Sequence, residues 1–156
     1  MASSELFCTF FLDRHFFGVP VQQVQEVIRY QEMTRVPLVP QVPQVVRGLI
    51  NLRGQIVTAI DLRRRLGMSE RCADHLPMNV VVRTDDGALS LLVDEIGDVI
   101  EVEEKTFEQP PQTLKGVARE MIRGVHKLPE RLLLLLDTER VVNVADPASI
   151  ADVRKA

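Results

Sequence analysis

The stretch "RGLINLRGQIVTAIDLRRRLG", residues 47–67, decides the fold because a degenerate second copy of it follows later in the chain. The copy is "RGVHKLPERLLLLLDTERVVN", residues 123–143, at an offset of 76. The identical positions are Arg47, Gly48, Leu52, Asp61 and Arg64, which match Arg123, Gly124, Leu128, Asp137 and Arg140. Self-similarity at one offset is the signature of a repeated structural unit, so two copies of one small unit are predicted.

A second pair of blocks precedes the first in each copy. "FGVPVQQVQEVI" (17–28) aligns with "LSLLVDEIGDVI" (89–100) at an offset of 72. The matched pairs are Val21 with Val93, Val27 with Val99, Ile28 with Ile100, Val19 with Leu91 and Val24 with Ile96. The larger offset of the later blocks implies a short insertion between them. The blocks keep the same order in both copies, which supports a duplication.

Each copy is predicted to be rich in β-strand. "FCTFFLDRHFFGVPV" and "NVVVRTDDGALSLLV" each place two β-prone runs around a polar turn, and the second turn contains an Asp-Gly hairpin signal. The apolar runs "IVTAI" (56–60) and "LLLLL" (132–136) are too short for helices and are predicted as strands covered on both faces.

The same short signal follows each apolar run. An Asp that can cap a helix comes first, an i, i+4 pair follows, and a residue that ends helices closes the signal. The residues are Asp61, Leu62, Leu66 and Gly67 in the first copy, and Asp137, Thr138, Val142 and Asn143 in the second. A helix of one or two turns is therefore predicted to close each unit.

Proline marks the connections inside the copies. Pro37, Pro40 and Pro43 recur every three residues, which favours an extended, polyproline-like path, and Pro110 and Pro111 occupy the corresponding place in the second copy. A stiff connection is the favoured interpretation, with a ligand for a proline-binding module as the alternative.

Composition limits the possible functions. The chain has 156 residues, 46% of them hydrophobic, which is typical of a globular protein. Its net charge is −3 and its pI about 5.6, whereas nucleic-acid-binding domains usually exceed a pI of about 9. Nucleic acid is disfavoured as a partner, although Arg63–Arg65 offers a local basic patch. A base-stacking platform is hard to build with 4% aromatic residues and Tyr30 as the single tyrosine.

No catalytic or metal-binding motif is apparent. Cys8 and Cys72 have neither a second cysteine nor a histidine at ligand spacing. His15, His75 and His126 lie outside any nucleophile or acid–base motif, so structural or solvated histidines are predicted. Glu101 and Glu103 alternate as on one strand face, and a solvated strand edge is favoured over a carboxylate pair.

The N-terminal apolar run gives no targeting signal. "LFCTFFL", residues 6–12, is too short and wrongly flanked for a signal peptide or a membrane span. We therefore expect a cytoplasmic protein that binds no cofactor and does not insert into the membrane.

The pattern resembles the CheW-type chemotaxis coupling proteins, whose domain also forms the regulatory end of the CheA histidine kinase. The resemblance runs from about Glu5 to Val144, and its carriers include "FGVPVQQVQEVIR", "GLINLRGQIVTAIDL", "LLVDEIGDVIEV" and "RGVHKLPERLLLLLDTERVVN". It implies a mainly β fold of two SH3-like five-stranded barrels that share a core and enclose a groove. We expect one domain over 1–156, with subdomains at roughly 15–77 and 78–144, and with the N-terminal strand and the C-terminal segment able to cross between them.

The resemblance also implies a function without catalysis. Family members are adaptors that bind the tip of a chemoreceptor's cytoplasmic helical hairpin and the regulatory domain of a CheA-type histidine kinase, in arrays at the membrane. The proline-rich connection between Thr34 and Gly48 is longer than in some family members, and we expect its length to affect which receptor class or array the protein serves. Alternatives are a coupling protein for pilus motility or gene regulation, and, from other classes, a small-ligand-binding barrel or an enzyme.

Site residues follow from the matching phrases. The resemblance implies a receptor-binding groove that contains Val24, Glu26, Val27, Ile28 and Arg53, with the barrel core as the alternative place for its apolar members. For the kinase contact, the resemblance gives only weak support to a surface that contains Met78, Asn79, Ile96 and Val99.

Arg53 breaks the symmetry of the two copies. It aligns with Pro129, although its neighbours Gly48 and Leu52 recur as Gly124 and Leu128. The barrel itself therefore does not demand this arginine, and we expect it to pair with Glu26 at the edge of the groove, because a desolvated guanidinium needs a partner.

Overall fold

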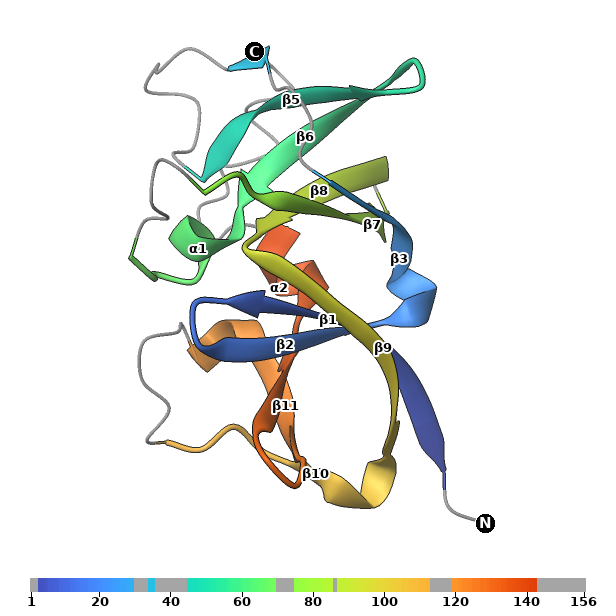
Figure 1. The fold of residues 1–156 in the computed structure, drawn as a ribbon, viewed down its shortest axis with the longest axis vertical. Helices are drawn as coiled ribbons and strands as arrows, with labels where there is room; N and C mark the ends of the chain where they lie inside the picture. The colour runs from blue at the N-terminus through green and yellow to red at the C-terminus, as the bar shows by residue number, and fades with distance from the viewer. Residues whose placement is uncertain are drawn as a thin grey trace.

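The computed structural model describes residues 3–29, 34–35, 45–69, 75–85, 87–112 and 119–142, in which two six-stranded sheets dominate (Figure 1). Sheet A contains, from edge to edge, β10 (Phe107–Glu108), β11 (Ile122–Lys127), β12 (Leu132–Leu136), β2 (His15–Pro20), β1 (Ser4–Leu12) and β9 (Glu95–Glu103). Sheet B contains β3 (Val24–Ile28), β7 (Met78–Thr84), β8 (Gly87–Val93), β6 (Gln55–Asp61), β5 (Val46–Leu52) and β4 (Thr34–Arg35). The predicted mainly β fold is confirmed, and each sheet exceeds five strands by one strand of two residues, β10 or β4.

The predicted hairpins and terminal helices are present. β1 and β2 pair around a turn in which Asp13 has a φ of 55°, and β7 pairs with β8 up to Thr84 and Gly87. The runs "IVTAI" and "LLLLL" lie in β6 and β12. The two runs were predicted to be covered on both faces, but the first residue of each run, next to the hairpin turn, is not. Ile56 is 61% exposed and Leu132 is 40% exposed.

Two short helices close the copies as predicted. The Asp61 carboxylate accepts hydrogen bonds from the backbone N–H groups of Arg63 (3.1 Å) and Arg64 (3.5 Å) at the start of α1 (Leu62–Arg65). Asp137 accepts one from the N–H of Arg140 (3.1 Å) in α2 (Thr138–Val142). Gly67 ends the first turn with a φ of 73°. Asn143, the side chain of Val142, and Pro37, Pro40 and Pro43 lie outside the described residues.

The two sheets exchange hairpins relative to the predicted division at residue 77. β2 of the first copy pairs in parallel with β12 of the second, and β8 of the second copy pairs in parallel with β6 of the first. The boundaries 15–77 and 78–144 therefore do not match the sheets. The crossing expected for the N-terminal strand extends to the whole β1–β2 hairpin. Sequence could not decide this, because both apolar runs and both hairpins show the same strand-forming pattern.

The chain passes between the sheets at two crossovers that correspond in the repeat. The first leads from β2 through the 3-10 helix η1 (Val21–Gln23) into β3, and the second leads from β8 through Asp94 into β9. Further along, the 3-10 helix η2 (Glu104–Thr106) joins β9 to β10, and η3 (Arg119–Met121) precedes β11.

A central apolar core lies between the sheets and confirms the predicted shared core. Its members come from both sheets and from both short helices. They include Phe10, Leu12, Phe17 and Val19 of sheet A, Ile60, Val80, Leu91 and Val93 of sheet B, Leu62 of α1 with Leu66 at its C-terminal cap, and Val141 of α2. A smaller cluster lies on the opposite face of sheet A and contains Phe7, Phe16, Val102, Leu133 and Leu135. Burial of this apolar surface is the main force that holds the two sheets together.

Candidate protein-binding surfaces

Arg53 occupies the tip of the β5–β6 hairpin. Leu52 pairs with Gln55, so Arg53 and Gly54 form a two-residue loop, and both have positive φ values of 52° and 89°. Two consecutive positive φ angles fit a type I′ turn, which matches the twist of the flanking strands. Asn51 supports the loop, because its Oδ1 accepts a hydrogen bond from the N–H of Gly54 at 2.8 Å.

The predicted pairing of Arg53 with Glu26 is confirmed. Arg53 Nη2 lies 2.5 Å from Glu26 Oε1, with the arginine side chain 79% exposed and the glutamate 19% exposed. An ion pair in such an exposed setting contributes at most about 1 kcal/mol to stability. The pair therefore serves mainly to place a guanidinium beside β3.

The other residues of the predicted groove lie on β3, at the edge of sheet B. Val27 is 37% exposed, whereas Val24 and Ile28 are half-buried. Val24 also packs against the central core. The structure thus brings Arg53 to Glu26 and leaves Val27 exposed on the opposite face of β3, because consecutive residues of a strand point to opposite sides. It gives Val24 the core role that had been the alternative.

The four residues of the predicted kinase contact divide between the sheets. Met78 and Asn79 lie on β7 of sheet B, whereas Ile96 and Val99 lie on β9 of sheet A. Met78 and Ile96 pack against the central core, and only Val99, at 57%, is well exposed.

Asn79 is a structural residue in this fold. It is 1% exposed, its amide donates to the carbonyl of Arg29 (3.1 Å), and its Oδ1 accepts from the hydroxyl of Ser90 (2.7 Å). A side chain that is fully buried and bonded in this way cannot touch a partner on the surface.

The structure adds a neighbour to Val99 that sequence reasoning missed. Leu6 on β1 is 47% exposed and pairs with Glu101, while half-buried Cys8, two residues further on, pairs with Val99. Leu6, Cys8 and Val99 form a small apolar strip on one face of β1 and β9. The signal was the alternation within "LFCTFFL", where residues 6 and 8 share a face opposite Phe7.

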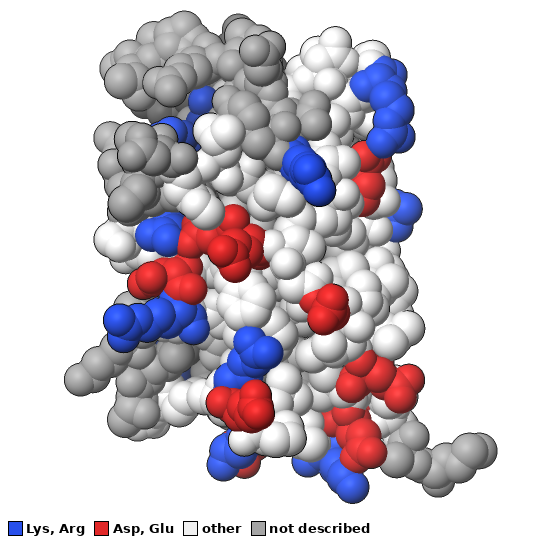
Figure 2. Space-filling view, in the orientation of Figure 1, with Lys and Arg blue, Asp and Glu red and all other residues white. Residues whose placement is uncertain are grey.

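Carboxylates continue this apolar strip along β9. β9 is the terminal strand of sheet A, and Glu101 and Glu103 are exposed on it, which confirms the predicted solvated edge. Figure 2 shows acidic side chains gathered at the lower right, where Figure 1 draws the lower part of β9 and η2. A partner with basic groups around an apolar contact would match this surface.

The three histidines have structural surroundings. His75 Nε2 lies 3.0 Å from the carbonyl of Asp94, and His126 Nδ1 lies 2.7 Å from the hydroxyl of Thr106. Burial lowers the pKa of His126 below its ordinary value. Nδ1 of His15 is buried without a hydrogen-bond partner.

Metal sites and membrane spans both need features that the described ranges of the chain lack. Within these ranges no group of three or more His, Cys, Asp and Glu side chains is arranged to hold a metal ion. No helix in the described part of the chain is long and apolar enough to cross a bilayer. Burial raises the pKa of the Cys8 thiol, and Cys72 lies outside the described residues.

Comparison with known proteins agrees with this geometry. A family model described as "CheW-like domain" matches residues 6–146. The chain belongs to the CheW-like domain family. Among the relatives of this CheW-like protein, "Chemotaxis protein CheW" of Treponema pallidum is 27% identical over 93% of the chain and 86% of its own length. "Chemotaxis protein CheW" of Bacillus subtilis is 30% identical over 90% of the chain and 88% of its own length.

A solved structure shows the same fold as this CheW-like chain. The crystal structure of scaffolding protein TtCheW from Thermoanaerobacter tengcongensis superposes with a TM-score of 0.80 at 24% identity, covering 92% of this chain and 95% of the other.

The duplication gives the CheW-like chain two equivalent exposed valines. Val27 on β3 and Val99 on β9 occupy the same position in the repeat, and both edge strands expose it, at 37% and 57%. The acidic neighbours Glu26 and Asp98 also correspond. Among the described residues, the first copy alone places an arginine against its acidic neighbour, because the tip of the β11–β12 hairpin carries Pro129 where Arg53 stands.

Proposed function

We propose that this protein is a non-enzymatic adaptor in chemosensory signalling, which couples the cytoplasmic hairpin tips of chemoreceptors to a CheA-type histidine kinase. Membership of the CheW-like family supports the proposal, as do relatives named as chemotaxis proteins and a scaffolding protein of the same fold. In this proposal the protein acts in the cytoplasm and is recruited to receptor arrays at the membrane.

The receptor-facing surface is proposed at β3 and the β5–β6 tip. Val27 offers an apolar contact, and the guanidinium of Arg53, 79% exposed while paired with Glu26, the residue that precedes Val27, offers directed donors at the same edge strand. A helical hairpin tip presents apolar side chains with polar groups around them, and such surfaces are recognised by an apolar contact with a few polar guides. The Glu26–Arg53 pair is the single observation that carries this assignment.

The kinase-facing surface is proposed at the strip formed by Leu6, Cys8 and Val99. This strip lies on β1 and β9 of sheet A, whereas Val27 lies on β3 of sheet B. Surfaces on two different sheets suit a protein that holds two partners at once. Linking several weak contacts in an array raises the effective concentration of each partner without further contacts.

The proposed coupling is tested by co-sedimentation. Membranes that carry a chemoreceptor with its cytoplasmic hairpin are spun down with a CheA-type kinase, with and without the protein. We expect the kinase to enter the pellet only when all three components are present. Binding of neither component by the wild-type protein would refute the proposal, and pelleting of the kinase to the same extent without the protein would refute the coupling role.

A further inference from the structure

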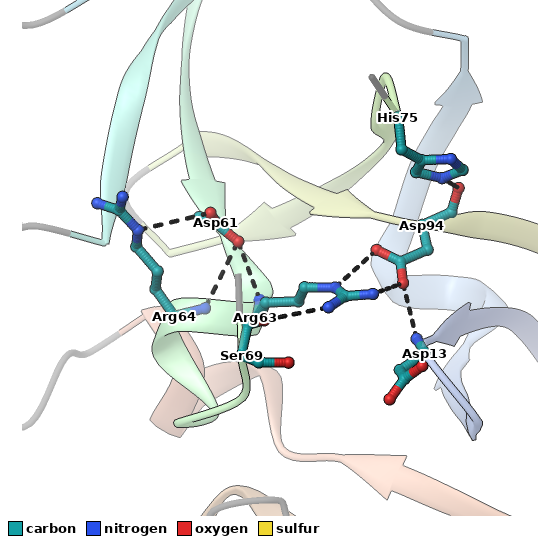
Figure 3. A network of polar contacts seen from close by, with 7 residues as sticks. All are labelled: Asp13, Asp61, Arg63, Arg64, Ser69, His75 and Asp94. Atoms are coloured by element: carbon teal, nitrogen blue, oxygen red, sulfur yellow. Dashed lines mark hydrogen bonds and ion pairs between the residues drawn. The ribbon is translucent and has the colours of Figure 1, made fainter. Parts of the chain in front are cut away.

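A carboxylate at the second crossover binds groups from both sheets. Asp94 is the residue between β8 of sheet B and β9 of sheet A. Its side chain accepts a hydrogen bond from the backbone N–H of Asp13 (2.7 Å), in the β1–β2 turn of sheet A. It also binds Arg63 of α1, which directly follows β6 of sheet B (Figure 3).

The contact between Arg63 and Asp94 is bidentate and largely buried. Arg63 Nε donates to Oδ1 at 3.0 Å, and Nη2 donates to Oδ2. The two side chains are 11% and 9% exposed. The hydrogen bond to Asp94 raises the pKa of Arg63, although burial acts in the opposite direction. Such a side-on guanidinium–carboxylate pair fixes both distance and direction.

Arg63 and Asp94 also contact both ends of the segment that joins the two copies. Arg63 Nη1 donates to the carbonyl of Ser69 (3.1 Å), and His75 Nε2 lies 3.0 Å from the carbonyl of Asp94. Figure 3 shows Ser69, His75 and the Asp13 turn arranged around the pair. The Asp13 turn, α1 with the Ser69 segment just after it, His75 and the second crossover therefore meet at one ion pair.

The sister crossover provides an internal comparison. In the repeat, Asp94 corresponds to Gln22 of η1, and Arg63 corresponds to Glu139 of α2. There the helix contacts the crossover through a neutral hydrogen bond, from the Thr138 hydroxyl to Gln23 Oε1 at 2.7 Å. The duplicated architecture thus has a charged connection at one crossover and a neutral one at the other.

We propose that the Arg63–Asp94 ion pair is an orientation lock, which fixes the angle between sheets A and B. The central core holds the sheets together by contacts that have little directional preference, whereas a buried, bonded ion pair selects one arrangement among those of similar burial. Because Val27 and Val99 lie on different sheets, the lock also fixes how these two exposed positions face relative to each other.

The lock is tested by measuring distances between spin labels in the full-length protein. Cys8 and Cys72 are replaced by Ser, and labels are attached through Gln25→Cys and Lys127→Cys, exposed positions on sheets B and A. Glu101→Cys with Lys127→Cys gives a control distance within sheet A. Each labelled pair is compared with and without Asp94→Asn, which keeps the shape of the side chain, and Arg63→Met, which keeps the bond between Asp94 and Asp13.

Both variants are expected to broaden or shift the distance between the sheets and to leave the distance within sheet A unchanged. Thr138→Val, which removes the neutral bond at the sister crossover, is expected to change neither distance. The proposal is overturned if the inter-sheet distance keeps its wild-type distribution, if both distances broaden alike, or if Thr138→Val broadens the inter-sheet distance as much.

Hydrogen exchange in the wild-type protein keeps the proposal testable should the variants fail to fold. A formed lock protects the Asp13 amide as strongly as the amides of the central β-strands. An Asp13 amide that exchanges at the rate of an exposed turn would refute it.

Discussion

The guanidinium carbon of Arg131 lies 4.3 Å above the centre of the Phe16 ring, and 5.4 Å from that of Phe11. Arg131 precedes β12 at the tip of the β11–β12 hairpin, so this contact joins the second hairpin tip to the β1–β2 hairpin. The Arg53–Glu26 pair makes the corresponding contact at the first hairpin tip. The two contacts differ in chemistry: the strength of a cation–π contact depends less on salt concentration than the strength of an exposed ion pair does.

We expect Arg131→Ala to lower the free energy of unfolding by about 0.5–1 kcal/mol, the usual size of a cation–π contact at an exposed site. Urea denaturation followed by circular dichroism measures the change. Glu130→Ala, at the exposed neighbouring position, is the control and is expected to leave stability unchanged. Equal stability of Arg131→Ala and the wild type would show that the ring contact contributes nothing.

The Glu26–Arg53 pair predicts a rescue by double charge reversal. Glu26→Arg or Arg53→Glu alone should weaken receptor binding about tenfold, which corresponds to roughly 1.4 kcal/mol. The double variant should recover part of that loss if the pair sets the geometry of the surface. Binding to receptor-bearing membranes is the measurement, and three variants that all bind like the wild type would contradict the assigned site.

Removal of the charge alone requires a residue that tolerates the backbone at position 53. With a φ of 52°, position 53 is left-handed, a conformation that asparagine adopts more readily than most residues with a side chain, so Arg53→Asn removes the guanidinium without adding backbone strain. We expect Arg53→Asn to weaken receptor binding and to change stability by less than about 1 kcal/mol. Lys127→Asn removes one charge from sheet A and should leave receptor binding unchanged.

Val24 and Val27 should respond differently to the same substitution. Val27→Glu adds a charge at an exposed position, so we expect weaker receptor binding with stability within about 0.5 kcal/mol of wild type. Val24→Glu places a carboxylate against the central core and should cost roughly 1–3 kcal/mol. Thermal unfolding and binding measured on both variants separate the two effects, and a Val27→Glu protein with wild-type affinity would exclude that valine from the interface.

Stability should fall as the pH drops below the ordinary histidine pKa of 6.5. Burial, assisted by the charge of Arg123, lowers the pKa of His126 and outweighs the opposite effect of Glu5. The unfolded chain therefore takes up a proton first, and this favours unfolding until His126 also charges in the folded state. Above pH 6.5 the effect vanishes because both states are neutral.

Unfolding midpoints measured from about pH 8 to pH 5 in the wild type and in His126→Gln isolate this contribution, because the other two histidines are common to both proteins. The difference between the proteins should grow as the solution is acidified. A difference that stays constant with pH would contradict the lowered pKa.

Local features of this fold could be predicted from sequence because their causes are local. The Asp61 and Asp137 caps follow from side-chain oxygens that reach N–H groups two or three residues away. The β7–β8 hairpin follows from its turn residues. The pairing of Glu26 with Arg53 spans 27 residues, yet the repeat revealed it, because Arg53 has no counterpart in the second copy.

Non-local features escaped prediction. Asn79 reads as a polar residue at the start of a strand, and its burial depends on Arg29 and Ser90, which other strands bring to it. The exchange of hairpins depends on which apolar run each hairpin meets in space. Leu6 lies in a segment that is apolar throughout, and only the register of β1 against β9 shows which face of it remains exposed.

The exchanged hairpins make the two copies interdependent. A fragment that ended at residue 77 would lack β8 and β7, which pair with β6 and β3, and the complementary fragment would lack β2, which pairs with β12. Neither half can complete its own sheet, so we expect the chain to fold and unfold cooperatively as one unit, slowly for its size because many contacts join distant residues. Duplication here has produced a domain that cannot be halved.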